Sequence, residues 1–526
     1  MKKNNYIQIF DTTLRDGQQC PGAGMSFADN IKYANLAMQL GVDVLEAGFP
    51  SASKLDFDIV NTIAKELSPQ KDSPIICGLC QLREPQIDLS IQSLKPAVKY
   101  GKARLHTYVP VSPALLQASL GYKGKDKKAI IKNLTKFTKK IIQEGLEVEF
   151  SPEGYSEMGE NFDFVTDLIR AAVEAGAVVI NCPDTIGGAH RLQGEEYFVK
   201  KLKKHAEILK KEFPNKKIIW STHCHNDFGV AVENTINSVF EGPVRQIECC
   251  INGLGERAGN ASLEQCVMII NYFSKYQKES FFTNIKTNKI KEISDFVSQK
   301  MLNRQYHFPI TGKNAVRHTS GGHTNAILKN ILAYQPFDPK IVGNEISLIF
   351  GPLSGGNHAQ SIIEKNGYIC RNEDKAKIAQ FIKDEYADRR KGITDEELMQ
   401  AYLKYIRPIN INHFDYSKSA NSSSVHLIGK FFDLTGKINQ THHGKGSALS
   451  ALQDLIDSKF SGVAIYNYQS HSDNKGIDAK SVCTIRINYK NNFYDGTGVD
   501  DDIEISAMKA LIDAVNKAYE EKYKNK

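Results

Sequence analysis

The strongest constraint on the fold of this chain is a repeat that runs from residue 6 to about residue 280. A short apolar run, a polar or glycine-containing turn and a longer stretch with helical periodicity follow one another eight times. Eight consecutive β-then-α units predict an α/β protein built on a (β/α)8 TIM barrel, with a doubly wound open sheet as the alternative. The predicted strands are residues 7–10, 44–47, 75–78, 104–108, 147–150, 178–182, 218–223 and 246–250.

Polar residues gather where these strands end. His223 and His225 close the seventh strand, and Asp16 follows the first. Alternation places both histidines on one face of the strand, and the carboxyl ends of all barrel strands share one rim. Two imidazoles and a carboxylate suit a divalent cation such as Mn²⁺, Mg²⁺ or Zn²⁺. Asn260, at the end of a glycine-rich stretch after the eighth strand, is a candidate for a further, neutral oxygen ligand.

The length and charge of the chain limit the other possibilities. Its 526 residues are enough for about two to four domains. The formal net charge is +7, but the lysines are scattered, so we expect no nucleic-acid partner. No segment has the length and hydropathy of a signal peptide or a membrane span, so we expect a cytoplasmic protein with no membrane partner and with reduced cysteines.

Beyond residue 280 the eightfold rhythm stops, and the sequence predicts three ranges. Residues 4–280 form the catalytic barrel. Residues 281–415 are mostly helical and contribute a polar, glycine-rich loop with His318 and His323, which we interpret as catalytic. A serine-rich connector at residues 412–424 leads into an α+β domain, residues 416–526, with glycine-rich turns before its two predicted helices. We interpret this domain as regulatory or assembly-forming.

Taken in order, the motifs resemble those of the 2-isopropylmalate synthase family, whose catalytic domain is a metal-dependent (β/α)8 barrel. The resemblance extends over nearly the whole chain. The matching motifs are Asp11-Thr-Thr-Leu-Arg-Asp-Gly17, Glu46-Ala-Gly-Phe-Pro50, His106-Thr-Tyr108, Glu149-Phe-Ser-Pro-Glu153, Pro183-Asp-Thr-Ile-Gly187, His223-Cys-His-Asn-Asp227, residues 253–260, Ser320-Gly-Gly-His323, residues 338–343 and Asp495-Gly-Thr-Gly-Val-Asp500.

The resemblance implies a role for each candidate site residue. It implies that Asp16, His223 and His225 bind the divalent metal, with Asn260 as a further or water-mediated ligand. Three residues would contact a 2-keto acid: Arg15, His106 and Thr185. Arg15 would also act in catalysis by stabilising the alkoxide that forms. Three more residues would act in catalysis: Glu153, which positions substrate or water, His323, which assists proton removal from acetyl-CoA, and its companion Tyr334.

The reaction implied by the resemblance is a Claisen-type condensation. Acetyl-CoA would add to 2-oxoisovalerate, and hydrolysis of the thioester would release 2-isopropylmalate and CoA, the committed step of leucine synthesis. The resemblance also implies that the C-terminal domain binds leucine as a feedback inhibitor. The protein would be a homodimer in which the loop carrying His323 crosses to the partner chain.

The sequence departs from the family pattern in three places, and other functions remain open. Gln18 replaces a glutamate, Thr324-Asn325 replaces Gln-Asp after His323, and Gly188-Ala-His190 replaces a tyrosine-containing continuation. Citramalate synthase, which uses pyruvate, and homocitrate synthase, which uses 2-oxoglutarate, share nearly the same constellation. Pocket size separates such acceptors by only a few kcal/mol. A regulator that binds metal and an amino acid without catalysis is the remaining alternative.

Overall fold

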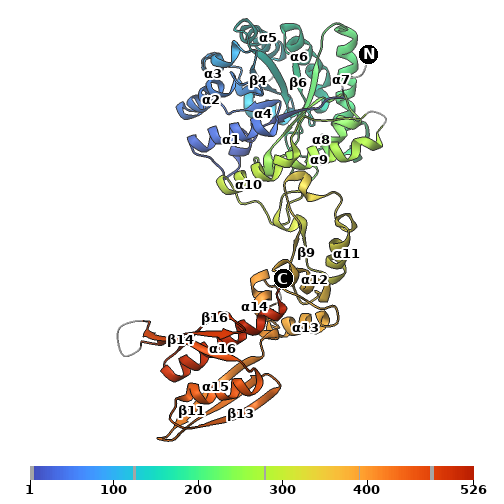
Figure 1. Cartoon of the computed structure of the whole chain (residues 1–526). Coiled ribbons are helices and arrows are strands. Elements are labelled where there is room, and N and C mark those ends of the chain that lie inside the picture. Colours follow the sequence, from blue (N-terminus) through green and yellow to red (C-terminus); the bar gives the residue numbers. More distant parts are fainter. Residues whose placement is uncertain (1–4, 122–125, 278–279, 390, 474–478, 526) are drawn as a thin grey trace. The chain divides into compact units, whose positions relative to one another are not determined.

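The first part of the chain forms a closed barrel of eight parallel strands (Figure 1). The computed structural model describes residues 5–121, 126–277, 280–389, 391–473 and 479–525, so the predicted domain ends at residues 4 and 526 lie outside it. The strands pair in sequence order, and β8 closes on β1 with Gln8 opposite Gln246. The predicted barrel is confirmed, and the open sheet is wrong. The strands are β1 (Gln8–Asp11), β2 (Val44–Glu46), β3 (Ile75–Gln81), β4 (Ala103–Pro110), β5 (Glu147–Glu153), β6 (Val179–Asn181), β7 (Ile219–His223) and β8 (Gln246–Cys249).

Helices follow the strands and cover the outside of the barrel. Serine N-caps begin the first two, where the hydroxyl of Ser26 accepts from the Asp29 N–H and that of Ser53 from the Asp56 N–H. The first helix ends at Gly41, whose φ of 94° is left-handed. The helices are α1 (Phe27–Leu40), α2 (Lys54–Leu67), α3 (Glu84–Val98), α4 (Pro113–Leu120), α5 (Lys127–Gln143), α6 (Phe162–Ala175), α7 (Phe198–Glu212), α8 (Ala231–Phe240), α9 (Leu263–Phe273) and α10 (Ile290–Lys300).

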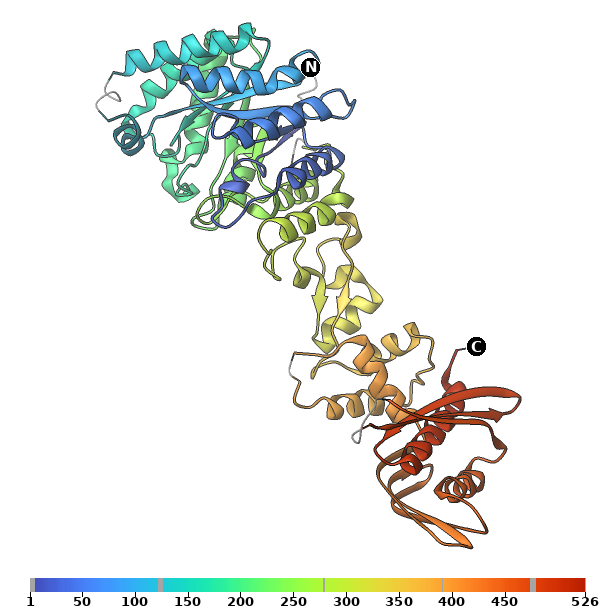
Figure 2. The same cartoon turned by 90° about the vertical axis from the view of Figure 1, so that its left-hand side faces the viewer.

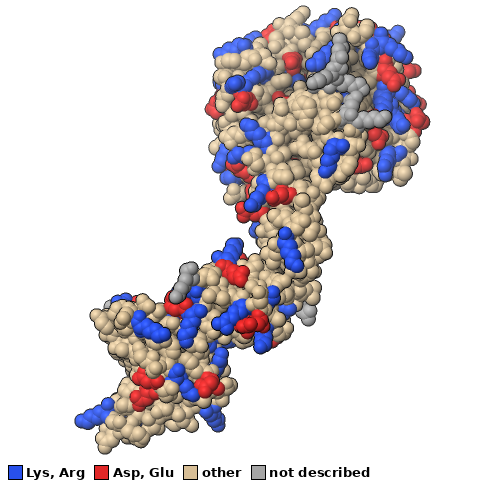
Figure 3. Space-filling model, turned by 45° about the vertical axis from the view of Figure 1, so that its right-hand side comes forward, with Lys and Arg blue, Asp and Glu red and all other residues tan. Residues whose placement is uncertain are grey.

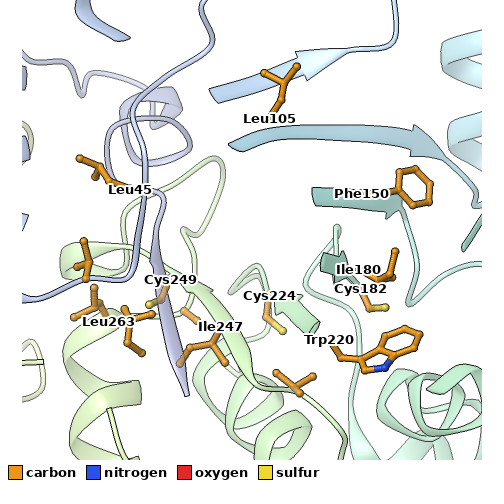
Figure 4. Close-up of a cluster of buried hydrophobic side chains, with 14 of the residues drawn as sticks. Leu45, Leu105, Phe150, Ile180, Cys182, Trp220, Cys224, Ile247, Cys249 and Leu263 are labelled. Atoms are coloured by element: carbon orange, nitrogen blue, oxygen red, sulfur yellow. The ribbon is translucent and has the colours of Figure 1, made fainter. Parts of the chain in front are cut away.

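A layer of apolar side chains lies between the barrel strands and the helices. Phe150, Ile247 and Cys249 are fully buried in it. Figure 4 shows them with Trp220 of β7 and with Cys224, which follows that strand. Because side chains alternate along a strand, the intervening residues point into the barrel. The apolar layer therefore fixes which polar residues reach the interior.

A second compact unit comprises residues 317–336 and 347–526. Its first part is mostly helical around a buried cluster that includes Phe350, Ile382 and Tyr402. A capping box begins α14, where the side chains of Thr394 and Glu397 each accept from the other's backbone N–H. The elements of this part are β9 (Arg317–His318), α11 (Gly321–Lys329), β10 (Ser347–Leu348), α12 (Gly356–Lys365), α13 (Lys375–Glu385) and α14 (Asp395–Ile406).

The C-terminal part repeats one pattern twice: three antiparallel strands followed by a helix (Figure 2, orange to red). The connector predicted at residues 412–424 is wrong, because most of that range lies in strands β11 and β12. The outer strands were not predicted because many of their residues are exposed, and because in β11 the alternation of Ile409 and Ile411 with Phe414 and Tyr416 is broken by a register shift after Ile411. Pairing with the central strand therefore decides their structure. The elements are β11 (Ile409–Lys418), β12 (Ser422–Phe431), β13 (Leu434–His443), α15 (Ala448–Lys459), β14 (Val463–Ser472), β15 (Ser481–Tyr489), β16 (Asn492–Asp500) and α16 (Ile503–Glu520).

Two glycines of β16 allow α16 to pack directly on that strand. A Cβ on Gly496 would lie 2.1 Å from the carbonyl oxygen of Ala510, and one on Gly498 would lie 2.0 Å from that of Ser506. The sequence that we expected to form a turn before the helix therefore lies inside a strand, where its glycines serve close packing.

The surface carries charges of both signs. On the face shown in Figure 3, lysine and arginine side chains are interspersed with aspartate and glutamate. Among the described residues, no helix combines the length and apolar character needed to cross a membrane.

Candidate metal-binding active site

Three predicted ligands meet at the carboxyl-terminal rim of the barrel. Asp16 follows β1, His223 ends β7, and His225 lies two residues further on. The Nε2 atoms of the two histidines are 3.3 Å apart, and Nε2 of His223 is 3.7 Å from Oδ2 of Asp16. One ligand atom from each residue lies within 4.8 Å of the other two, so a single cation can contact all three.

The surroundings favour the protonation states that ligands need. Burial lowers the pKa of His223 and of His225 to about 4, so both imidazoles are neutral near pH 7. Burial acts to raise the pKa of Asp16, but the charge of Arg15, with smaller contributions from His223, His225 and Asn260, outweighs it and holds that pKa well below its usual value. A charged carboxylate beside two neutral imidazoles is the state in which these groups bind a divalent cation. The residues present therefore fit the metal that the sequence implies.

Asn260 brings an amide oxygen to the same place. Its Oδ1 is buried without a hydrogen-bond partner in the part of the chain that the structure describes, whereas its Nδ2 donates to the carbonyl oxygen of Leu254. A single β-bridge pairs its backbone with that of His225. The preceding glycines permit this placement, because a Cβ on Gly255 would lie 2.3 Å from Nδ2 of Asn260. The free oxygen suits a hard cation.

Arg15 lies next to the ligands in a network of buried charges. Its Nε donates to Oε2 of Glu46 at 2.5 Å, its Nη1 donates to Asp16, and its Nη2 lies 3.9 Å from Oε2 of Glu248. Nδ1 of His106 is 2.9 Å from the other oxygen of Glu46. Burial acts to lower the pKa of His106, but Glu248 and Glu46 outweigh it and raise that pKa to about 9. Arg15 and His106 thus supply positive charge beside the ligands.

A cavity of about 270 Å³ opens at this rim. Its apolar wall includes Phe49, Leu79 and Pro183. Burial raises the pKa of Glu153, and the hydroxyl of Thr185 accepts from the Gly154 N–H at 2.8 Å. The sequence-predicted residues that line the cavity are Arg15, Asp16, His106, Glu153, Thr185, His223 and His225.

Arg257 joins three loops around the cavity. Its Nε donates to Oδ1 of Asp227 at 2.9 Å, and its Nη2 donates to the carbonyl oxygen of Thr185 at 2.8 Å. It therefore ties the loop after β8 to the loops after β7 and β6.

His323 and Tyr334 belong to the second unit, within residues 317–336. Their rings stack with centroids 3.8 Å apart and planes 20° from parallel. The ring of His318 lies 5.9 Å from that of His323, and Nε2 of His318 is 3.0 Å from Nε2 of Gln335. The structure thus brings the predicted histidine and tyrosine together within this unit.

Comparison with known proteins accounts for the whole chain. Its residues 6–297 match the HMGL-like family, residues 310–391 the homocitrate synthase post-HMGL domain-like family, and residues 392–519 the LeuA allosteric (dimerisation) domain. The 2-isopropylmalate synthase of Prochlorococcus marinus subsp. pastoris is 33% identical over 550 residues, covering 100% of this chain and 96% of its own. The chain belongs to the 2-isopropylmalate synthase family.

A second member of the 2-isopropylmalate synthase family, from Neisseria meningitidis serogroup B, is 32% identical over 525 residues, with 98% of this chain and 97% of its own covered. Among solved structures, the HMG-CoA lyase of Bacillus subtilis matches 57% of this chain and 95% of its own, with 18% identity and a TM-score of 0.45.

Two departures from the pattern of the 2-isopropylmalate synthase family can now be placed. The amide of Gln18 donates to the carbonyl oxygen of Leu14 and to Oδ1 of Asn30, and its oxygen accepts from the Met25 N–H. Gln18 therefore braces the segment before α1 and is absent from the cavity lining. In the second unit, Asn325 accepts from Asn357, and no carboxylate hydrogen-bonds to the histidine two residues earlier among the described residues.

Some polar residues of the cavity were missed by the sequence analysis: Ser151, Asn181 and Glu248. Each lies on a barrel strand among apolar neighbours, at a position that alternation directs inward. Glu248, in the run Gln246-Ile-Glu-Cys249, carries the clearest signal, because a carboxylate inside a buried strand needs a partner.

Proposed function

We propose that this chain condenses acetyl-CoA with 2-oxoisovalerate and hydrolyses the thioester, which yields 2-isopropylmalate and CoA. The observation that carries the proposal is the cluster of Asp16, His223 and His225 beside Arg15, in a barrel whose full-length relatives are named 2-isopropylmalate synthases. The reaction needs a polarised keto carbonyl and a group that stabilises developing negative charge, and these residues supply both requirements.

The keto acid binds next to the proposed ligands. A divalent cation held by Asp16, His223, His225 and Asn260 would polarise the keto carbonyl and make its carbon electrophilic. Arg15, whose Nη2 makes no hydrogen bond to any described residue, stabilises the negative charge that develops on the keto oxygen. His106 and Thr185 contact the rest of the substrate.

The cavity favours an acceptor with one carboxylate and an apolar side chain. Phe49, Leu79 and Pro183 offer apolar surface. The two arginines in the lining are already engaged, Arg15 by Asp16 and Glu46 and Arg257 by Asp227. His106, the remaining cation of the lining, is paired with Glu46, and the free Nη2 of Arg15 is assigned to the keto oxygen. A second carboxylate, as in 2-oxoglutarate, would therefore lack an unpaired cation among the described lining residues.

The remaining residues have proposed roles in bond formation and in hydrolysis. His323 takes a methyl proton from acetyl-CoA, the resulting carbanion bonds to the keto carbon, and the keto oxygen takes up a proton to become a hydroxyl. Tyr334, stacked on His323, orients its ring. Glu153 positions the water that attacks the thioester carbonyl, after which CoA leaves as the thiol.

The C-terminal match to the LeuA allosteric (dimerisation) domain supports two further parts of the proposal. The protein is a homodimer, and leucine binds the C-terminal domain as a feedback inhibitor.

The deciding experiment measures thiol release from acetyl-CoA by protein loaded with Mn²⁺, Mg²⁺ or Zn²⁺, with 2-oxoisovalerate, pyruvate or 2-oxoglutarate as acceptor. We expect a preference for 2-oxoisovalerate, inhibition by leucine and loss of activity in Asp16→Ala. Preference for pyruvate or 2-oxoglutarate would reassign the chain to a sister synthase. Bound metal without release from any acceptor would contradict the proposal in favour of a regulator.

Mixing two inactive variants tests whether His323 serves the partner subunit. We expect Asp16→Ala and His323→Ala homodimers to be inactive alone and to regain up to about a quarter of wild-type activity after subunit exchange, the share expected when half of the dimers are mixed and each has one intact site. Exchange without any recovery would contradict catalysis by His323 across the dimer.

A further inference from the structure

Glu248 occupies a position in β8 directly beside the metal-ligand candidate in β7. The register of the two strands pairs His223 with Glu248, and the next inward pair below them is Ser221 with Gln246. That lower pair is hydrogen-bonded, with Nε2 of Gln246 donating to the hydroxyl of Ser221 at 3.0 Å. In the upper pair, Nδ1 of His223 lies 3.0 Å from Oε2 of Glu248. The barrel register itself therefore sets the carboxylate against this imidazole.

The two side chains have unused hydrogen-bonding capacity. Nδ1 of His223 and both carboxylate oxygens of Glu248 are buried, and none has an aligned hydrogen-bond partner among the described residues. The other ring nitrogen of His223 faces Asp16 and His225. Besides Nδ1 of His223, the cation near this carboxylate is Arg15, whose Nη2 lies farther away, 3.9 Å from Oε2 of Glu248.

The contact between Glu248 and His223 is important because it can decide which ring nitrogen of His223 carries the proton. A neutral imidazole carries one N–H, and the nitrogen that binds a cation must be the other one. The Nε2 atoms of His223 and His225 face one another at 3.3 Å, so both rings need their lone pairs at Nε2 to bind one ion. His225 has no partner for its Nδ1 among the described residues, so the two ligands differ in how they are held.

We propose that Glu248 is a positioning residue that orients His223 for metal binding by accepting a hydrogen bond from its Nδ1–H. The carboxylate fixes the tautomer with the lone pair at Nε2, directs the ring toward Asp16 and raises the basicity of the ligating nitrogen. This inference rests on the metal site of the proposed function. It adds a carboxylate that acts through the histidine and does not contact the ion.

The experiment measures Zn²⁺ affinity by competition with a chromophoric chelator. We expect Glu248→Ala to weaken Zn²⁺ binding about 10–100-fold, and Glu248→Gln, whose amide oxygen can still accept from Nδ1–H, to weaken it less. Glu149→Gln is the matched control. Glu149 is equally buried in the barrel but pairs with Arg104 and Gln246, so we expect its variant to stay within about 3-fold of wild type.

A double-mutant cycle separates positioning from general damage to the barrel. We expect Glu248→Ala to lose its effect in a His223→Ala background and to keep it in a His225→Ala background. Equal effects in both backgrounds, or wild-type Zn²⁺ affinity in Glu248→Ala, would overturn the inference and leave the proposed function standing. Absence of Zn²⁺ binding by the wild-type protein would overturn both.

Discussion

At the level of single residues, burial does not have the same effect on every ionisable group of the site. The two histidines are neutral, whereas the aspartate keeps its charge. His223 and His225 lose their protons because their surroundings are desolvated. Asp16 stays ionised in the same surroundings because Arg15 is next to it. The protein therefore prepares a neutral nitrogen pair and an anionic oxygen before any ion arrives.

The first prediction concerns the anionic ligand. Asp16→Asn keeps the shape of the side chain but removes its charge, so we expect metal affinity to fall at least about 100-fold and thiol release to fall to background. Isothermal titration with Mn²⁺ measures the affinity. Asp58→Asn, an exposed carboxylate on α2, is the control, and an Asp16→Asn protein with wild-type affinity would contradict the assignment.

A second prediction concerns acid stability. His205 is buried between the hydroxyls of Tyr155 and Thr166, and burial lowers its pKa to about 4. Its neutral form is favoured in the folded state, so its contribution is complete above the unfolded pKa of about 6.5 and is lost as the pH falls toward 4. Between pH 6.5 and pH 5 we expect the free energy of unfolding to fall by roughly 2 kcal/mol on this account.

Urea unfolding measures this effect through the fluorescence of Trp220, the one tryptophan of the chain. His205→Gln should be less stable than wild type at pH 7 but should lose less stability on acidification. Parallel pH profiles for the two proteins would contradict the prediction. Comparing the two proteins also cancels the shared contribution of other buried histidines.

The sequence sufficed for some residues of the site and not for others. His223, His225 and Asp16 were predictable because they follow apolar strands whose ends share a rim. The charged network inside the barrel was not predictable, because the neighbours of Glu248 depend on the register between strands. No local sequence pattern specifies that register. The hydrogen-bonding geometry of this network is a property of the closed barrel.

At the level of elements, the barrel strands were easier to predict than the C-terminal sheets. Barrel strands are buried on both sides, so several of them, such as β2 and β3, contain apolar runs that the sequence reveals. In β14, every residue after Val463 is exposed, and the apolar run from Val463 to Tyr466 gives way to the polar residues 467–472, apart from Tyr468, so the sequence does not mark the length of the strand. Only β12 and β15, the central strands of the two C-terminal sheets, carry enough buried residues to be recognised.

The third prediction follows from the packing of α16 on β16. Gly498→Ala would place a methyl group 2.0 Å from the carbonyl oxygen of Ser506, so the helix must shift outward. We expect a loss of about 1–3 kcal/mol in the stability of the C-terminal part. Gly355→Ala, in the same unit with open space around its Cβ position, should change stability little, and equal losses in both variants would contradict the packing argument.

At the level of the whole molecule, the hydrophobic core is divided. One buried cluster lies within residues 7–342, a second within 350–406 and a third within 409–518. The metal-site candidates all belong to the first cluster's unit, and the glycine-packed helix belongs to the other. Each part of the chain therefore has its own buried core, and the proposed metal site can be tested in one part while the packing of α16 is tested in the other.

The fourth prediction is that calorimetry resolves at least two unfolding transitions. A divalent cation at 100 times its Kd should raise the barrel's free energy of unfolding by about 2.7 kcal/mol and move only that transition. Gly498→Ala should lower only the other one. A single transition that responds to both changes would show that the two units unfold together.

The spacing of the proposed ligands along the chain also determines when the proposed metal site can first form during synthesis. Asp16 emerges early, but His223, His225 and Asn260 lie more than 200 positions later, and β1 must wait for β8 before the ring closes. At about 5–20 residues per second, a ribosome needs roughly 12–50 seconds to pass from the first ligand to the last. For most of that interval the growing chain holds Asp16 without either histidine, and Asn260 follows His225 by another 35 residues. The proposed four-donor site can therefore form only in chains whose eight strands have all been made, so a chain truncated before β8 lacks the complete site.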